Sequence, residues 1–337
     1  MNILHLPTEI AGQANLSARG LREIGIRAAN TARPNAFGYP VDIDPVFAAL
    51  PLLKGIRNPL LFFRWLRDFD LFHYHKSPYL PAGLDIKLLR HRRKPFVVEF
   101  WGSDIRLAKL EKARNPFFVG DNADNQKHKR HRLEFWASHT DEVVMSDHSA
   151  DIFLKPYFNK IQIVGQRVDT RLYRPNYPSP ANNCPRIVHA PSATAVKGTQ
   201  YVNRAIESLK KAGLQFIYSE VAGVSHQQAM QIYGQADIII DQLRLGSHGV
   251  FACEAMALGK PVICYILDEL LPTYPPGFPI INANPETIAT VLEELILAPE
   301  KRHEIGRRSR TYAENVHDIR VVARKLLAIY QNKLLHS

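Results

Sequence analysis

The chain has 337 residues, 46% of them apolar and 22% charged, and a formal net charge of +11. This length suggests two domains, and the apolar content excludes a mainly disordered chain. No run of 18 apolar residues occurs, so we expect no membrane-spanning helix. The first residues also lack the basic start and long apolar stretch of a secretory signal. The three cysteines, Cys184, Cys253 and Cys264, lack metal-ligand spacing and indicate reduced thiols in a cytoplasmic protein.

Strand-like apolar runs alternate with helical patterns in the first half. Leu16, Leu21 and Ile24 form one apolar stripe and predict a helix over 16–25 that ends at Gly25. A second helix is expected from Ser149. The predicted strands are 2–6, 70–75, 96–100, 142–146 and 161–165. This alternation indicates βαβ units and a mostly parallel sheet.

The second half repeats the same rhythm. Gly213 and Gly259 each follow a helical pattern, and glycine commonly ends a helix. The predicted strands are 186–190, 216–219, 237–242 and 261–265. The predicted helices are 199–212, 226–236, 250–258, 284–297, 301–314 and 318–335. The fold class is therefore α/β, with two doubly wound Rossmann-like domains facing a cleft and ligands beyond the carboxyl ends of the strands.

Proline content marks the domain boundary. The stretch 174–185 holds Pro175, Pro178, Pro180 and Pro185, and such a stretch is typical of a linker. We predict a first domain over 1–174, a linker over 175–185, a second domain over 186–315 and a terminal helix over 316–337. Residues 1–177 carry a net charge of +9 and residues 178–337 only +2. The first half is therefore expected to meet an anionic partner.

The segment 236–265 carries the clearest chemical signal. It reads as a strand, a loop with Gly246 and Gly249, a helix containing Glu254, and another strand. The glycines permit close approach of a ligand to the backbone, and the helix beginning at Val250 presents free N–H groups to an anion. A carboxylate at Glu254 suits paired sugar hydroxyls. A glycine turn before an ordinary solvated glutamate fits the spacing equally well.

Several motifs in order resemble one family. Glu-Ala-Met-Ala-Leu-Gly-Lys-Pro-Val (254–262) is similar to the donor-binding signature of retaining, GT-B-fold glycosyltransferases of the family 4 type, the glycosyl transferases group 1. The segments 3–14, 100–104, 165–175 and 189–199 resemble that family's substrate loop, central turn, interdomain segment and phosphate-binding stretch, in that order. The resemblance implies the GT-B fold, with a terminal helix that crosses back to the first domain.

The resemblance also implies roles for single residues. Glu254 matches the glutamate that holds the ribose, Lys197 the lysine that contacts the diphosphate, and Gly12 the small residue that lets the phosphates approach. The donor site is then expected to comprise Gly12, Lys197, Gly198, Gly246, Ser247, His248, Gly249, Val250 and Glu254. A solvated loop lysine and a simple turn are the structural alternatives for Lys197 and Gly12. The implied donor is a nucleoside-diphosphate sugar, used without a metal or other cofactor.

The chain departs from the family pattern at three places. Gly246 stands where the first glutamate of the Glu-x7-Glu pattern is expected, so Ser247, His248 or backbone N–H groups would take over its contacts. No basic residue occurs over 191–196, where the family often has an arginine. Trp101 replaces the histidine of the central turn. A retaining front-face transfer, in which the leaving phosphate helps to take the acceptor's proton, needs phosphate stabilisation more than a strong protein base.

The acceptor is expected at the first domain. Its candidate residues are Gln13, His75, Trp101 and Asp104, and the candidate catalytic residues are His75, Lys197 and His248. His75 ends a strand and could donate to a phosphate or hydroxyl, or could pack in the core beside His73. Trp101 could stack on a sugar or fill the core, and Asp104 could orient the acceptor or cap a helix. Asp68 and Asp70 have the spacing of a metal-binding pair but are interpreted as surface residues.

Basic stretches favour an anionic surface. The segments 60–67, 85–94 and 127–132 combine Arg and Lys with bulky residues and could rest on the inner face of a membrane, or be solvated helix faces. Nucleic-acid binding is not favoured, because aromatic-interleaved binding motifs are absent. The predicted function is sugar transfer to a glycan, glycolipid or other surface-polysaccharide precursor. The alternatives are a GT-B-type sugar-nucleotide epimerase and a non-catalytic nucleotide-binding relative.

Overall fold

The computed structural model describes residues 1–33, 38–43, 54–120, 123–224 and 226–336. The chain forms two compact units, each built on one parallel sheet. The first unit comprises Met1–Leu107, Ala123–Arg167 and Ile319–Ser337, and the second comprises Ala108–Asn122 and Val168–Asp318. The terminal helix therefore belongs to the first unit, as predicted, although most of the chain just before it belongs to the second.

The first sheet has the strand order β2-β1-β3-β4-β5-β6. Its strands are β1 (Asn2–Leu6), β2 (Arg27–Asn30), β3 (Leu71–His75), β4 (Phe96–Glu99), β5 (Glu142–Met145) and β6 (Lys160–Ile163). All the pairings are parallel, so the carboxyl ends of the strands share one edge. The sequence patterns predicted five of these strands and missed β2, a four-residue edge strand that begins with an exposed arginine.

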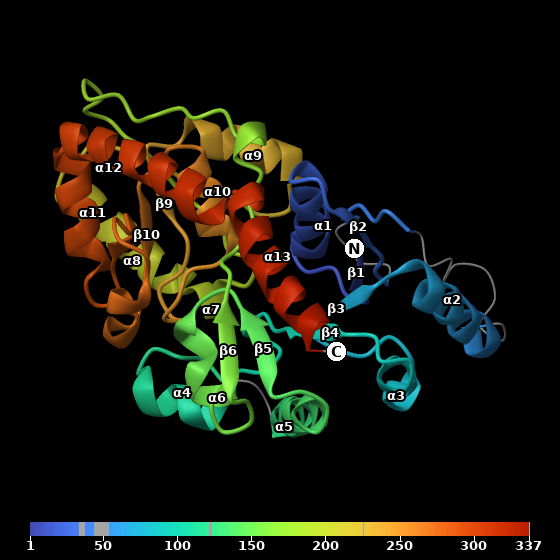
Figure 1. The fold of residues 1–337 in the computed structure, drawn as a ribbon. Coiled ribbons are helices and arrows are strands. Elements are labelled where there is room, and N and C mark those ends of the chain that lie inside the picture. Colours follow the sequence, from blue (N-terminus) through green and yellow to red (C-terminus); the bar gives the residue numbers. More distant parts are fainter. Residues whose placement is uncertain (34–37, 44–53, 121–122, 225, 337) are drawn as a thin grey trace. The chain divides into compact units, whose positions relative to one another are not determined.

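Helices cover both faces of the first sheet. One face packs against α1 (Gln13–Glu23) and α13 (Ile319–Leu335), with Leu21 and Val322 in the shared core. The two helices lie side by side, blue and red in Figure 1. They approach closely at Gly20, where a Cβ atom would lie 2.4 Å from the Ile319 carbonyl oxygen.

The other face of the first sheet carries aromatic contacts. Phe62 of α2 (Lys54–Asp68) packs on Phe72, and Trp136 of α5 (Ala123–Ala137) packs on Tyr74. In the described part of the unit, the other helices are η2 (Pro81–Gly83), α3 (Leu84–His91), η3 (His148–Ala150) and α6 (Asp151–Leu154). The predicted helix from Ser149 thus appears as the short η3 and α6. Asp68 and Asp70 lie at the amino-terminal edge of the sheet, where they accept hydrogen bonds from Asn2 and neighbouring arginines.

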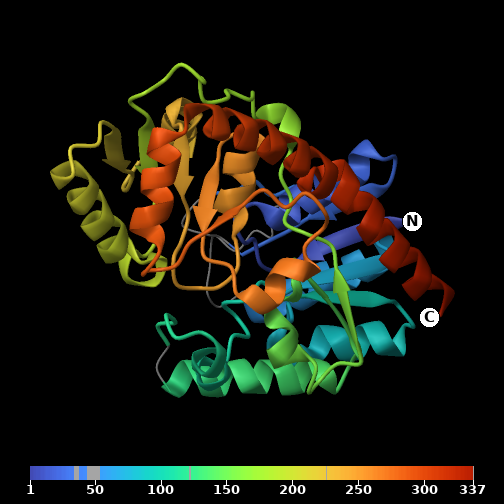
Figure 2. The same cartoon turned by 90° about the vertical axis from the view of Figure 1, so that its left-hand side faces the viewer.

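The second sheet has the order β11-β10-β9-β7-β8, again with every pairing parallel. Its strands are β7 (Arg186–His189), β8 (Ile217–Glu220), β9 (Ile238–Ile240), β10 (Val262–Cys264) and β11 (Ile281–Asn282). Figure 2 shows these strands between helical layers. The predicted strands agree within one or two residues at each end; the pattern over 237–242 is the longest overestimate, and β11 was missed.

Two cores flank the second sheet. One contains α8 (Thr199–Lys211) and α11 (Ile288–Leu297), and the other contains α9 (His226–Gln235), α10 (Val250–Ala257) and the end of α12 (Pro299–Tyr312). The shorter helices of this unit are α4 (Ala108–Arg114), η4 (Thr170–Leu172), α7 (Thr194–Lys197), η5 (Asp268–Thr273) and η6 (Ala313–His317). The proline-rich stretch 175–185 lies within the second unit, where Asn182 donates to Asp237 (2.9 Å).

Candidate functional site

The first unit gathers polar side chains where its strands end. His5, His73 and His75 lie on β1 and β3, and their registers place them on the same face of the sheet as the α1 and α13 core. All three imidazoles are fully buried. His5 Nδ1 lies 3.0 Å from His75 Nε2, and His73 Nδ1 lies 2.6 Å from the Tyr330 hydroxyl of α13. Burial holds the pKa of each histidine well below its ordinary value, so the cluster is neutral.

A buried ion pair adjoins the histidines. Glu99, the last residue of β4, accepts two hydrogen bonds from Arg167, at 2.6 and 2.9 Å, and both side chains are fully buried. The same carboxylate lies 3.3 Å from His73 Nε2 and 3.5 Å from His75 Nδ1. Because a buried charge is costly unless it is paired, the bidentate contact stabilises both groups by compensating their charges. Sequence reasoning missed this pair, because Arg167 lies 68 positions from Glu99 within a motif assigned to the interdomain segment.

Gln13 is committed to the backbone of Arg167. Its side-chain nitrogen donates to the Arg167 carbonyl (2.9 Å), and its side-chain oxygen accepts from the Arg167 N–H (2.8 Å). Gly12, which precedes α1, adopts a φ of 77°, a conformation that glycine reaches without strain. In this structure Gln13 therefore holds the segment containing Arg167, and the acceptor contact expected of it stays a prediction.

Trp101 and Asp104 form the turn after β4. The Trp101 ring stacks on His75, with centroids 5.7 Å apart, and the Arg167 guanidinium lies 5.1 Å from the ring centre. Asp104 accepts a hydrogen bond from the Trp101 N–H (3.0 Å) and is buried, which raises the pKa of its carboxyl. The structure thus joins four of the predicted residues, Gln13, His75, Trp101 and Asp104, in one network that includes Arg167.

The three histidines are the group, among the described residues, whose ligand atoms lie near enough to suit a metal ion, within 4.8 Å of one another. However, the rings of His73 and His75 are stacked and nearly parallel, with an interplanar angle of 7°. Imidazole lone pairs lie in the ring plane, so two stacked rings cannot both direct a nitrogen at one ion. The arrangement therefore fits a hydrogen-bonded network better than a metal centre.

The second unit places a lysine and a carboxylate together at the corresponding edge. Lys197 Nζ lies 2.7 Å from Asp241 Oδ1; the lysine side chain is 15% exposed and the aspartate is fully buried. Asp241 directly follows β9, and its other oxygen lies 3.4 Å from the Gly249 nitrogen at the start of α10. The pair thus links the lysine before α8 to the beginning of α10. The sequence signal for Asp241, a polar residue directly after a buried strand, was absorbed into the predicted strand 237–242.

The glycine at position 246 has a structural reason. Gly246 adopts a φ of 79°, and a Cβ atom there would lie 2.7 Å from Leu267 Cγ. The main-chain N–H of Leu267 also donates to the Gly246 carbonyl (2.9 Å). A glutamate at this position would be strained and would displace Leu267, which explains why this chain lacks the first glutamate of the family pattern.

Ser247 and His248 are buried rather than exposed at the edge. The His248 ring packs against Tyr274, Phe278 and His317, with centroids 5.3–5.7 Å apart, and its Nδ1 lies 3.6 Å from Cys253 Sγ. The structure therefore places His248 in an aromatic cluster. Lys197 and Gly249, which were predicted to share the donor site with His248, are connected through Asp241. The predicted catalytic role of His248 is not tested by this packing.

Glu254 lies on α10, beyond the glycine loop. The Tyr173 hydroxyl donates to Glu254 Oε1 (3.0 Å). Burial raises the pKa of the Glu254 carboxyl to about 7, and the hydrogen bond from Tyr173 partly opposes this shift. Arg310 donates to the carbonyls of Thr170 and Tyr173, at 3.0 and 2.7 Å, and so fixes the segment that carries Tyr173. With a pKa of about 7, the Glu254 carboxyl is partly protonated near neutral pH, and it already accepts a hydrogen bond from the Tyr173 hydroxyl. Such a carboxyl is suited to hydrogen bonding with other neutral hydroxyl groups.

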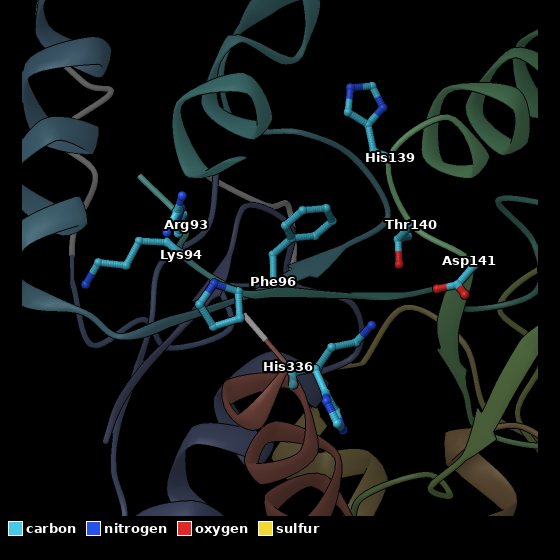
Figure 3. A pocket seen from close by; sticks show the side chains of 9 residues that line it. Arg93, Lys94, Phe96, His139, Thr140, Asp141 and His336 are labelled. Carbon is cyan, nitrogen blue, oxygen red and sulfur yellow. The ribbon is translucent and has the colours of Figure 1, made fainter. Parts of the chain in front are cut away.

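A separate pocket of about 340 Å³ lies in the first unit. Figure 3 shows its lining, which includes Arg93, Lys94, Phe96, Asp141 and His336. Phe96 begins β4, so the pocket lies at the amino-terminal edge of the sheet, away from the histidine cluster. Two of its cationic groups already have partners: Lys94 donates to the Phe69 carbonyl (2.8 Å), and Lys333 pairs with Glu142 (2.7 Å).

The second unit brings Lys197, Asp241 and the glycine loop to the start of α10, the helix that carries Glu254. Residues 195–312 match the family described as glycosyl transferases group 1. The matched segment contains Lys197, Gly246, Gly249 and Glu254. The resemblance predicted from the motifs is therefore confirmed over this segment, at the level of glycosyl transferases group 1. No curated protein matches the chain significantly.

Solved structures extend the comparison to the whole chain. Sucrose-phosphate synthase from Thermosynechococcus elongatus is 12% identical, with a TM-score of 0.62 and full coverage of both chains. The HepE protein of Anabaena, solved with UDP-glucose, is 12% identical, with a TM-score of 0.65 over 98% of this chain and 100% of its own. UDP-GlcNAc 2-epimerase from Neisseria meningitidis, bound to UDP-GlcNAc, is 13% identical, with a TM-score of 0.56 and full coverage of both chains. These likenesses show the fold, two Rossmann-like α/β domains of the GT-B type, as predicted.

Proposed function

We propose that the protein is a glycosyltransferase that moves a sugar from a nucleoside-diphosphate sugar to a glycan, glycolipid or other surface-polysaccharide precursor. The observation that carries this proposal is the coincidence of the family match with the residues that meet in the second unit. Lys197 and Asp241 lie beside the start of α10, and Glu254 follows on the same helix. Two of the structural neighbours were solved with UDP-glucose or UDP-GlcNAc, which supports a nucleotide-sugar donor.

The roles follow from chemistry. Lys197 would stabilise the charge that develops on the leaving diphosphate, and the N–H groups at the start of α10 would add to this stabilisation. Glu254 would accept hydrogen bonds from the ribose hydroxyls. A front-face transfer with retention asks the protein to position two substrates and to stabilise a phosphate. That demand agrees with the neutral imidazoles of the first unit, which supply no strong base. The absence of a metal or cofactor requirement stays a prediction.

The acceptor side is proposed to rest on an anionic membrane surface. On α2, Leu60 and Phe63 are 63% and 48% exposed, and the side chains of Arg64 and Arg67 beside them are more than 70% exposed. Such a face can insert apolar groups while its arginines meet lipid phosphates. Within the described part of the chain, no helix is both long and apolar enough to cross a membrane. Retention on anionic liposomes, compared with neutral ones, tests this contact, and equal retention on both would count against it.

The test of the function begins with binding. A thermal-shift screen of nucleoside diphosphates and their sugars should raise the melting temperature, because a ligand that binds only the folded state stabilises it. The donor so found is then supplied with candidate lipid-linked and glycan acceptors, and transfer is followed with a labelled sugar. Glu254→Ala and Lys197→Ala should lose this transfer. Wild-type activity in both variants would refute the site assignment.

A sugar-nucleotide epimerase is the second candidate, because the Neisseria epimerase shares the fold over the whole chain. Incubation of the labelled donor without acceptor separates the two. A changed sugar still attached to its nucleotide indicates an epimerase. The family match to glycosyl transferases group 1 favours transfer. Nucleotide binding without turnover on a broad panel of donors and acceptors would instead indicate a non-catalytic relative.

A further inference from the structure

Arg244 lies directly beside the lysine that would bind the diphosphate. The Leu243 N–H donates to the Lys197 carbonyl (3.0 Å), so the two segments are joined along their backbones. Gly198, the next residue after Lys197, has a φ of 81° and precedes α8. A Cβ atom on Gly198 would lie 3.2 Å from Arg244 Cγ and 3.5 Å from Cδ. The arginine stem therefore covers Gly198 at the beginning of α8.

The guanidinium group is held in one orientation. Its Nε donates to the Phe117 carbonyl (2.6 Å) and its Nη1 to the Ala195 carbonyl (3.2 Å), while the ring of Tyr201 lies 5.7 Å from its central carbon. The Asn115 side chain donates to the Arg244 carbonyl (2.9 Å). These contacts fix a half-buried side chain whose rotamers would otherwise be many.

The charge of Arg244 is not compensated in the way that the charge of Lys197 is. Lys197 pairs with buried Asp241, whereas the partners of the Arg244 guanidinium are carbonyl oxygens. The two bonds use two of its five N–H donors. Within the described residues no carboxylate pairs with it. A fixed, uncompensated guanidinium is suited to bind an anion with two oxygens, such as a phosphoryl group.

We propose that Arg244 is a second cation of the diphosphate site and contacts the phosphate oxygens of the donor together with Lys197. This inference rests on the proposed function and adds a residue to it. It also accounts for the lack of a basic residue over 191–196, because the arginine reaches the same place from the loop after β9. Asn115 and Phe117 act as positioning residues, since they hold the backbone and the guanidinium of Arg244 without contact to the donor.

The test compares the binding of nucleoside diphosphates with the binding of the corresponding nucleosides, which carry no phosphate. Isothermal titration measures the binding of UDP, GDP and ADP, each against its own nucleoside, to wild type, Arg244→Gln, Arg244→Lys and Lys197→Ala. The matched control is Arg204→Gln, because the exposed Arg204 of α8 also lies over the Tyr201 ring, at 6.0 Å. We expect Arg244→Gln to weaken binding of the preferred diphosphate about 10- to 100-fold and to leave nucleoside binding within about twofold. Arg244→Lys should recover part of the loss, and Arg204→Gln should behave as wild type.

The possible outcomes separate the proposals. An equal loss of diphosphate and nucleoside affinity in Arg244→Gln indicates a structural role and overturns the inference. A loss in Lys197→Ala alone overturns it as well, but leaves the proposed function intact. Binding of no nucleoside diphosphate by the wild type refutes the proposed function, and the inference with it. Unfolding curves check that each variant folds, and Arg244→Lys carries the comparison if Arg244→Gln does not.

Discussion

The two units present opposite kinds of polar cluster at the carboxyl ends of their sheets. In the first unit, His5, His73, His75, Glu99 and Arg167 are all fully buried, and the two charged groups, Glu99 and Arg167, compensate each other. In the second, Lys197 is partly exposed and Glu254 is only partly buried, and glycines lie between them. A cluster that satisfies its own charges is suited to holding a shape. A cluster whose lysine is partly exposed beside the start of a helix is suited to binding.

The largest effect is expected from breaking the first cluster. Arg167→Met leaves Glu99 as a buried carboxylate without its ion-pair partner, which should lower the free energy of unfolding by about 3–5 kcal/mol. Urea unfolding followed by circular dichroism measures this change. The double variant Glu99→Gln/Arg167→Met should recover part of the loss, because no buried charge then remains.

A surface pair provides the matched control for that experiment. Arg64 pairs with Asp68 on α2, and the arginine side chain is 71% exposed. Arg64→Met should cost less than about 1 kcal/mol. If Arg167→Met costs no more than Arg64→Met, the first cluster does not stabilise the fold, and the contrast between the two edges disappears.

Lys197→Ala tests whether the cluster of the second unit binds a diphosphate. It removes the cation and leaves the carboxylate of Asp241 facing the place expected for the diphosphate. We expect the affinity for a nucleoside diphosphate to fall by about 2–3 kcal/mol, or roughly 30- to 150-fold, as when one partner of a buried charge pair is truncated. Titration calorimetry measures the change, and Lys301→Ala, at an exposed pair with Glu294, is the control. Unchanged binding in Lys197→Ala would show that the lysine serves only to neutralise Asp241.

Much of this fold could be predicted from the sequence because its elements are local. Apolar runs such as 238–240 and glycine stops such as Gly213 and Gly259 depend on near neighbours, and they placed most strands and helices within one or two residues. The strand β2 carried too weak a pattern. Lys197 and Glu254 could be proposed as donor-binding residues because their motifs are contiguous, and these roles stay predictions.

The rest of the site depends on contacts that no local pattern records. Arg167 pairs with Glu99, which lies 68 positions away in the sequence, and Arg244 is oriented by Phe117, which lies 127 positions away. His248 was predicted as a donor-site residue, and that role stays a prediction; its contacts with Tyr274 and His317, which come from distant segments, could not be predicted from the sequence. The missing glutamate at position 246 could be read from the sequence, while its cause, a left-handed φ against Leu267, could not.

A smaller effect is expected from the pH dependence of Glu254. Its pKa is raised from 4.5 to about 7 by burial, so between these pH values the folded chain holds one more proton than the unfolded chain. The free energy of unfolding therefore decreases as pH rises from about 4.5 to 7 and is constant above that range. The melting temperature of wild type, relative to Glu254→Gln, should decrease by a few degrees over this interval. Parallel curves for the two proteins would contradict the raised pKa.

The smallest effect is expected at the hydroxyl that holds Glu254. Tyr173→Phe removes the hydrogen bond from this hydroxyl to Glu254, at a cost of about 1 kcal/mol, and raises the pKa of Glu254 further because the bond lowers it. The pH at which the wild-type stability curve levels off should therefore move upward in Tyr173→Phe. Tyr218→Phe is the matched control, since that hydroxyl donates to Asn203 on the other side of the second sheet. An upward shift in Tyr173→Phe alone would show that Tyr173 tunes the carboxyl through their shared bond. If the levelling-off pH does not move in Tyr173→Phe, the hydroxyl merely fills space beside Glu254, and the second cluster would owe its chemistry to burial alone.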